Sequence, residues 1–134
     1  MDVFIVRDLV NGGLVPLDAL VTRLPQIAPV FWAFKRTEFA HGDLFGLTLS
    51  EFERLTWDLS EGFVVGDQDF RRLMSADFQM IAGVIEAIGS PGVLIRIECV
   101  DAGQWEISTS DSEISTQLQQ RGFSRAANNL EGRR

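Results

Sequence analysis

The segment GVLIRIECVDAGQWEISTSDSEISTQLQQRGF (residues 92–123) decides the fold predicted for this chain. Side chains at positions 93–100 alternate between an apolar set and a mixed set, the period of two that a β-strand requires. Asp-Ala-Gly at 101–103 suits a tight turn, and the alternation resumes at 104–109, with Trp105 and Ile107 on one side. We therefore expect an antiparallel hairpin. The predicted apolar face of its first strand comprises Val93, Ile95, Ile97 and Cys99.

A short helix is expected directly after this hairpin. Ser110 and Glu113 have the spacing of a capping box, in which a hydroxyl and a carboxylate each satisfy a free backbone N–H. Ile114 and Leu118 then follow at helical spacing. The sequence therefore predicts a capped helix that folds back over the hairpin.

The first third of the chain predicts two strands separated by a helix. The run Val-Phe-Ile-Val within residues 2–7 is typical of a short buried strand, which Asn-Gly-Gly at 11–13 ends. A helix is expected over residues 16–24, because Pro16 suits a first helical turn and leucines recur on one face. The run Val-Phe-Trp-Ala-Phe at 30–34 is apolar on both faces, so we expect it in the centre of the sheet, covered on both sides.

The middle of the chain is predicted to be mainly helical. Ser50 and Glu53 form a second candidate capping box, which opens a helix over residues 51–59. The expected inner stripe of this helix comprises Phe52, Leu55 and Leu59.

Residues 61–66 are short enough to be either an edge strand or a loop. Asp67 is a suitable N-cap for the segment that follows them. From Phe70 to Ile88 apolar residues recur at steps of three and four, so one long helix or two abutting helices are expected to reach Gly89.

These elements predict one layered α+β domain over residues 1–123. Its sheet is expected to be mixed or antiparallel, with helices packed on it, because the C-terminal hairpin requires an antiparallel pair. Residues 124–134 lack apolar periodicity and are expected to be a frayed or disordered basic tail.

Composition narrows the class of protein. A chain of 134 residues with 46% hydrophobic content suffices for one domain with a single core. Its one cysteine, Cys99, excludes an intramolecular disulfide, and we expect it to be a buried, unreactive thiol. The N-terminus lacks the basic start of a signal peptide, and no apolar run is long enough to span a bilayer. We expect a cytoplasmic protein without a membrane partner.

The charge of the chain is unevenly distributed. The formal charge is −7 at pH 7, and residues 121–134 hold four arginines against one glutamate, so residues 1–120 carry −10. Such a body repels nucleic acid, whose binding depends on basic groups, and speeds its encounter with a basic protein. A role in solubility alone is the alternative explanation of this charge. We expect no nucleic-acid partner.

A search for catalytic chemistry finds no enzyme motif in the sequence. It contains neither a Gly-x-Ser-x-Gly elbow nor a phosphate-binding glycine loop. His41 is the single histidine, and a solvated turn residue is its plainer interpretation, because acid–base catalysis needs a partner. Asp67 and Asp69 could bind a divalent ion only if further oxygen donors converged on them. We expect no catalytic residue, cofactor or metal.

Acidic and aromatic residues are concentrated between positions 43 and 77, where eight acids face three arginines. A large aromatic beside carboxylates is typical of a binding hot spot for a cationic surface. Trp57 is rotated by about 200° from Leu55 and Leu59 on a helix, and should therefore lie off the inner stripe. The alternative is a solvated acidic helix face with aromatics in the core. The candidate partner-binding residues, termed the acidic surface, are Trp57, Asp58, Glu61, Asp67, Asp69 and Phe70.

The closing segment resembles the C-terminal part of small acidic bacterial proteins that are either uncharacterised or assigned as toxin-immunity proteins. The likeness lies in the strand that ends Glu-Cys-Val-Asp at 98–101, the run Gln-Trp-Glu-Ile-Ser at 104–108, and residues 111–118 with Phe123. The aromatic run at 30–34 resembles their early strand. The resemblance implies a cytoplasmic protein that covers the active site or an essential surface of a toxin domain encoded nearby, without catalytic residues of its own.

We therefore expect a non-enzymatic immunity or inhibitor protein whose acidic surface binds a basic toxin domain. One alternative is a subunit of a homo-oligomer, which would need an exposed apolar patch. Another is an enzyme acting on a small molecule, which would need a convergent acid–base pair in a concave site. The oligomeric state stays open.

Overall fold

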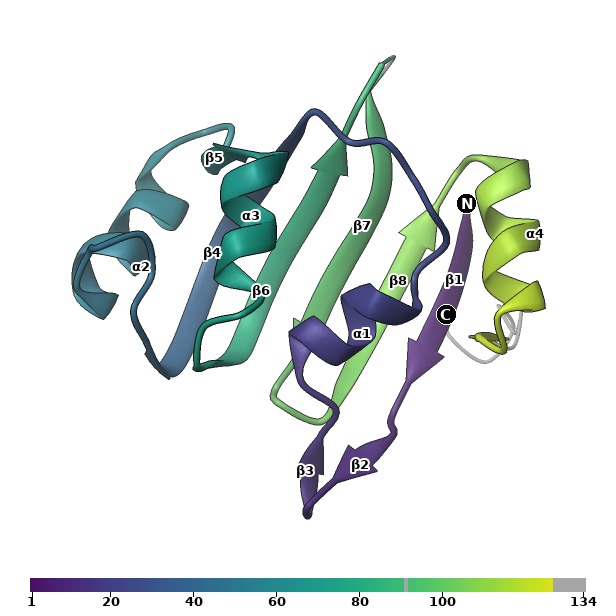
Figure 1. Ribbon diagram of the computed structural model, residues 1–134, viewed down its shortest axis with the longest axis horizontal. Helices are drawn as coiled ribbons and strands as arrows, with labels where there is room; N and C mark the ends of the chain where they lie inside the picture. The colour runs from purple at the N-terminus through teal and green to yellow at the C-terminus, as the bar shows by residue number, and fades with distance from the viewer. Residues whose placement is uncertain (91, 127–134) are drawn as a thin grey trace, which may run out of the picture.

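The described residues form a seven-stranded sheet that is the frame of the protein (Figure 1). The computed structural model describes residues 1–90 and 92–126. The strands follow the order β5-β4-β6-β7-β8-β1-β9, and each neighbouring pair is antiparallel. The α+β class is confirmed, and of the two sheet types expected the antiparallel one is present. The strands are β1 Asp2–Val6, β4 Phe31–Gly42, β5 Phe63–Gly66, β6 Phe78–Ile88, β7 Val93–Val100, β8 Gln104–Thr109 and β9 Ser124–Arg125.

Within the described ranges four helices lie over one face of the sheet (Figure 1). Phe34 of β4 contacts Phe52 of α2, Trp32 stacks on Phe70 of α3, and α4 reaches β1 through Ser115. The opposite face carries half-buried charged pairs, such as Lys35–Glu86 and Arg96–Glu98. The helices are α1 Leu17–Arg23, α2 Leu49–Asp58, α3 Asp67–Leu73 and α4 Ser112–Gln120.

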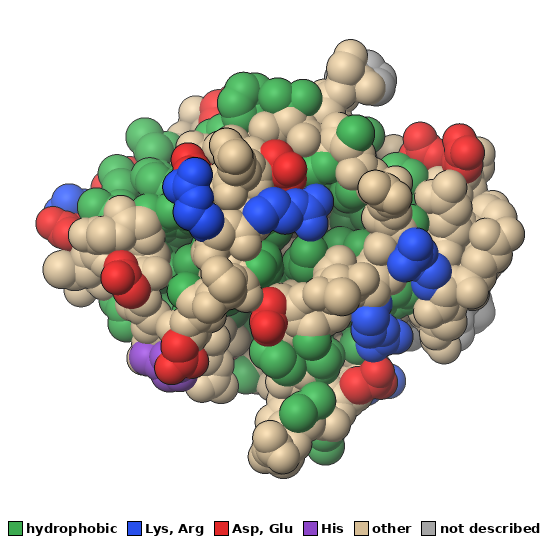
Figure 2. All heavy atoms as spheres, in the orientation of Figure 1, with side chains coloured by type: hydrophobic (Ala, Val, Ile, Leu, Met, Phe, Trp, Pro, Cys, Tyr) green, Lys and Arg blue, Asp and Glu red, His purple; other side chains and the backbone are tan. Residues whose placement is uncertain are grey.

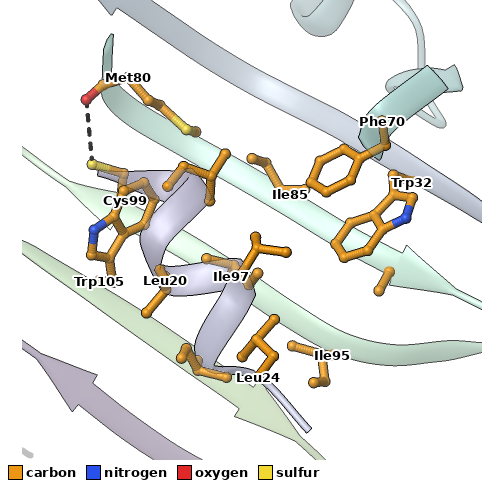
Figure 3. Packing of buried hydrophobic residues seen from close by; sticks show 14 of the residues in the cluster. Leu20, Leu24, Trp32, Phe70, Met80, Ile85, Ile95, Ile97, Cys99 and Trp105 are labelled. Carbon is orange, nitrogen blue, oxygen red and sulfur yellow. Dashed lines mark hydrogen bonds between the residues drawn. The ribbon is translucent and has the colours of Figure 1, made fainter. Parts of the chain in front are cut away.

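The C-terminal hairpin is confirmed. β7 and β8 pair from Val100 opposite Gln104 to Arg96 opposite Ser108. The predicted inner face is buried from Ile95 onward, whereas Val93, at the start of the strand, is half exposed. Figure 3 shows Ile95, Ile97, Cys99 and Trp105 lying under Leu20 and Leu24 of α1.

The prediction of one long helix or two abutting helices that reach Gly89 is wrong, because only the first part of this segment is helical. α3 ends at Leu73, and residues 78–88 form β6, which lies between β4 and β7 in the sheet. Ile85 and Ala87 lie two positions apart on the helix-covered face of this strand and are fully buried, whereas Ile81 and Ile88 of the predicted stripe are only partly buried. β-branched residues and a glycine at 83 favour the strand.

Both predicted capping boxes are displaced. α2 begins after Thr48, whose hydroxyl accepts from the Glu51 N–H while the Glu51 carboxylate accepts from the Thr48 N–H. α4 begins after Asp111, whose carboxylate accepts from the N–H groups of Glu113 and Ile114. Ser50 and Ser110 therefore do not cap these helices, since a better-placed residue lies two positions earlier or one position later.

The predictions for the first strands need two corrections. β4 is longer than residues 30–34 and lies second from the edge, so Phe31 is half exposed on the face without helices. The break at residues 11–13 is the turn of a two-stranded hairpin, β2 Leu9–Val10 and β3 Gly13–Leu14, which projects from the sheet (Figure 1). Of the two alternatives predicted for residues 61–66, the edge strand is the one present, as β5.

The C-terminal end of the domain lies beyond the predicted boundary at residue 123. Ser124 and Arg125 form β9 against β1, and Ala126 N–H donates to Val3 O. Arg125 also lies 3.4 Å from the Asp2 carboxylate. The rest of the predicted tail, residues 127–134, lies outside the described residues.

Replacing Ile97 or Trp105 by alanine is expected to lower the free energy of unfolding by about 2–5 kcal/mol, because each change leaves a cavity in the core. Trp105 also donates from Nε1 to Val15 O at 2.7 Å. Urea titration measures this, with Val93→Ala as the control expected to stay within about 0.5 kcal/mol. A larger effect at Val93 than at Ile97 would contradict the assigned inner face.

The thiol of Cys99 is buried, as predicted. It donates to Ile81 O at 3.3 Å and points toward Met80 O (Figure 3). Burial raises the pKa of the Cys99 thiol to about 11. An unfolded thiol ionises near about 8.5, so the folded protein keeps a proton that the unfolded chain loses.

The stability that this protonated thiol contributes is therefore present below about pH 8.5 and is lost as the pH rises through about 11. We expect the gap in unfolding free energy between the native protein and Cys99→Ala to narrow over this range. The chain has no tyrosine and one lysine, which limits competing titrations. Rapid alkylation of the folded protein by iodoacetamide at pH 8 would contradict a buried thiol.

Candidate partner-binding surface

The position of α2 depends on a bulge between β4 and β6. The pairing of the two strands shifts between Lys35 and Glu38, and Arg36 has a left-handed conformation with φ 49°. Gly83 of β6 lies against this point with φ +125°. A Cβ at Gly83 would lie 2.6 Å from Thr37 Cα, so only glycine allows the strands to approach this closely.

Two polar side chains of α2 bind the backbone at this bulge. Thr56 Oγ1 accepts from the N–H and the hydroxyl of Thr37 at 3.0 and 3.1 Å. Glu53 Oε2 accepts from Phe39 N–H at 2.8 Å. Both threonines are buried, so these contacts fix which side of α2 faces the sheet. The opposite side of the helix faces solvent.

Trp57 lies on this outer side of α2 and is 62% exposed, which confirms that it lies off the inner stripe. Leu59 was expected inside but is 46% exposed. The reason is that α2 ends at Asp58 and Leu59 takes an extended conformation, so helical periodicity no longer applies to it. The two residues form an exposed apolar area at the end of the helix.

Phe70 is not part of the acidic surface, because it is fully buried. Its ring stacks on the indole of Trp32 with centroids 3.8 Å apart and planes 4° apart (Figure 3). The alternative interpretation of the sequence, in which helically spaced aromatics form the core, is right for this residue. It could not contact a partner without unfolding α3.

Asp67 connects α3 to the sheet. Its Oδ1 accepts from Trp32 Nε1 at 2.8 Å and from Arg71 Nε at 3.2 Å. The predicted N-cap role is wrong: Gly66 is the cap residue and Asp67 is the first residue of the helix. Its carboxylate is therefore already engaged within the protein.

Asp69 is exposed, but its charge is compensated in place by Arg72 at 2.8 Å. With the Asp67–Arg71 pair, the two aspartates at the start of α3 each face an arginine of the same helix. The local charge of α3 is thus close to neutral. Of the six residues of the acidic surface, four are exposed, namely Trp57, Asp58, Glu61 and Asp69.

The carboxylates around α2 are compensated much less. Arg36 and Arg54 are the basic residues in this stretch, and neither forms an ion pair with another residue in the ranges 1–90 and 92–126. In Figure 2 blue side chains lie over the middle and the right of the helical face, and the end formed by α2, at the left, shows a green area with red and blue side chains at its margin. The acidic residues of this end that form no ion pair within the described ranges are Glu38, Asp43, Glu51, Glu53, Asp58, Glu61 and Asp77.

Not all of these carboxylates are free to meet a partner. The Thr48 N–H donates to Glu51, which holds the pKa of this carboxyl below its ordinary value, and Glu53 is bound to β4. Asp58 and Glu61 have no such internal bond within the described residues, and both are exposed. They lie beside Trp57 and Leu59 in the chain. We call Arg54, Trp57, Asp58, Leu59 and Glu61 the α2 surface.

Asp58 occupies a position that is unfavourable for stability. It is the last residue of α2, where the helix dipole places partial negative charge and where no basic residue lies in the last turn. A carboxylate there costs about 0.3–1 kcal/mol relative to a neutral side chain.

Sequence reasoning missed a second exposed apolar group beside α2. Val64 of β5 is 44% exposed and Phe31 of β4 is 47% exposed on the face without helices. Phe31 pairs with Gly66, two positions from Val64, so the two side chains are diagonal neighbours across the β4–β5 pair. The sequence did not predict that Phe31 is exposed, because the apolar pattern of residues 30–34 is the same for a central strand and for a strand next to the edge.

The described residues contain two larger cavities, and neither gathers a metal-binding cluster. One of about 500 Å³ lies between α1 and α3 over the Asp67–Arg71 pair. The other, of about 540 Å³, lies beside the β2–β3 hairpin and is lined by His41 and Asp77 among others. His41, expected in a turn, lies near the end of β4 opposite Gln79. No hydrogen bond among the described residues joins it to Asp77.

Thr56→Val is expected to lower the free energy of unfolding by about 1–3 kcal/mol, because it leaves the buried N–H and hydroxyl of Thr37 without their acceptor. Chemical denaturation followed by circular dichroism measures the loss. Thr116→Val is the matched control, since that hydroxyl is exposed and bonds only within α4. Equal effects of the two changes would show that the contact with β4 does not hold α2.

Among the described residues no helix is long and apolar enough to cross a membrane. No protein-family model, no curated protein and no solved structure matches the chain significantly.

Proposed function

We propose that this protein is a non-enzymatic inhibitor of the immunity type, which binds a basic toxin domain through the α2 surface and neutralises it. The protein works in the bacterial cytoplasm, where it meets a toxin encoded by a neighbouring gene. It supplies binding and no catalytic group. An enzyme would need a convergent acid–base pair, and a homo-oligomer would bring two chains of charge −7 into contact.

The observation that carries this proposal is the exposure of Trp57 between carboxylates that the protein itself does not neutralise. Tryptophan is enriched among the residues that dominate binding energy, and the exposed Trp57 has a second exposed apolar side chain, Leu59, two positions away in the chain. Asp58 and Glu61 add a negative field that accelerates encounter with a basic protein. The ordered attachment of α2 to the β4 bulge supports a surface that is formed before binding.

Asp58→Asn with Glu61→Gln is expected to slow association with the product of the neighbouring gene several-fold at low salt. Charges at an exposed surface are screened over about 8–10 Å near physiological ionic strength, so the difference should shrink as salt rises. Trp57→Ala is expected to speed dissociation by about 30-fold, since truncating an aromatic anchor commonly costs about 2 kcal/mol. Surface-binding kinetics over a salt series separates the two effects.

Matched controls lie away from the α2 surface, in other parts of the fold. Asp101→Asn with Glu113→Gln changes the net charge equally, and Leu9→Ala removes an exposed apolar side chain from the β2–β3 hairpin. Asp58→Asn should not destabilise the fold, because it removes a charge that opposes the helix dipole. Binding that is indifferent to salt, or that responds equally to the test and control variants, would overturn the proposal, as would a failure of the neighbouring product to bind.

A further inference from the structure

Strand β5 leaves one edge of the sheet open next to the α2 surface. It is the terminal strand in the order, and its bonded neighbour within the described residues is β4. Asp67 N–H donates to Val30 O at 3.2 Å, so the backbone of residue 67 faces β4. The backbone N–H and C=O groups of successive residues in a strand point alternately to its two sides. Those of Val65 and Phe63 therefore also face β4, whereas those of Val64 and Gly66 face outward.

The outward backbone groups are available for pairing. They are the N–H and C=O of Val64 and the N–H of Gly66, since the Gly66 carbonyl lies at the start of α3 and serves the helix. A Cβ built on Gly66 would meet no atom within 4 Å, so the face of the sheet beside this edge is open at Gly66. β5 has neither a proline nor a charged side chain, the usual means of protecting an edge.

Exposed apolar side chains surround this edge. Val30 and Phe31 at the start of β4, Val64 on β5 and Leu59 before it are all at least 44% exposed. Phe31 and Val64 lie on the face without helices, while Leu59 belongs to the α2 surface. Backbone groups, apolar side chains and the carboxylates of Asp58 and Glu61 therefore occur together along one short border of the molecule.

We infer that β5 receives an extended segment of the cationic partner, which adds a strand to the sheet at this edge. The inference rests on the proposed function and specifies how the partner binds. Main-chain hydrogen bonds to Val64 and Gly66 provide the register, as in other strand-addition complexes. Alternate side chains of the added strand are apolar where they cover Phe31 and Val64, and basic where they approach Glu61.

Charge favours a basic partner over a second copy of this chain as the added strand. Two copies joined through β5 would bring two chains of −7 each into contact, with Asp58 and Glu61 of both beside the joint. Like charges across a strand pair are destabilising. A basic strand would instead neutralise these carboxylates, so a heterologous segment fits the edge better.

Val64→Pro tests the edge, because it removes an outward N–H while leaving the bonds of Phe63 and Val65 to β4. Proline is tolerated at such edge positions. We expect it to weaken binding of the neighbouring gene product about tenfold or more, whereas Val64→Thr, which keeps the N–H and the branched shape, changes binding much less. In the complex, hydrogen exchange of the Val64 and Gly66 amides should slow.

A second pair of variants guards against misfolding of the proline variant. Val64→Lys should weaken binding by repelling a basic strand, and Val64→Glu should retain or strengthen it. If binding depends on Trp57 but ignores Val64→Pro and Val64→Lys, the strand addition is overturned and the proposed function stands. If the neighbouring product does not bind at all, the proposed function falls. Strand addition at β5 is then tested with a synthetic peptide of alternating lysine and valine. If this peptide does not slow hydrogen exchange of the Val64 and Gly66 amides, the strand addition is overturned.

Discussion

The close approach of β4 and β6 at Gly83 is the constraint on which the rest of the structure depends. It bends β4 at Arg36 and turns backbone N–H groups of the strand away from the regular ladder and toward the helical layer. Thr56 accepts one of them, and the helix that carries it is placed accordingly. The exposure of Trp57 follows from this chain of contacts, since a different rotation of α2 would bury it.

The distribution of charge on the surface depends on whether the acidic residues of a helix form ion pairs with arginines of the same helix. On α3 the acids precede arginines by three or four positions, so they pair along the helix and the charge stays local. Arg54 lies four positions before Asp58, yet the two form no ion pair in the described structure. The carboxylates of α3 are therefore paired with arginines of the same helix, whereas Asp58 of α2 remains available to a basic protein.

Local patterns predicted the parts of this fold that depend on neighbours in the chain. The hairpin of β7 and β8 and the burial of Cys99 follow from alternation alone. The prediction failed where tertiary pairing decides: residues 78–88 fit a helical stripe but have strands on both sides. The predicted N-cap residues were wrong because several Ser, Thr and Asp residues lie close together before each helix. Their spacing alone does not show which of them is the N-cap. For the candidate site, the exposure of Trp57 was predictable, but the burial of Phe70 against Trp32 depends on contacts between distant segments.

The three tryptophans occupy very different environments, which gives the protein a built-in optical reporter. Trp32 and Trp105 are buried beneath α3 and α1, whereas Trp57 is open to water. A soluble quencher such as iodide reaches only an exposed indole, so it separates the emission of Trp57 from that of the other two. Changes at the α2 surface and changes in the core can thus be followed in one sample without any attached dye.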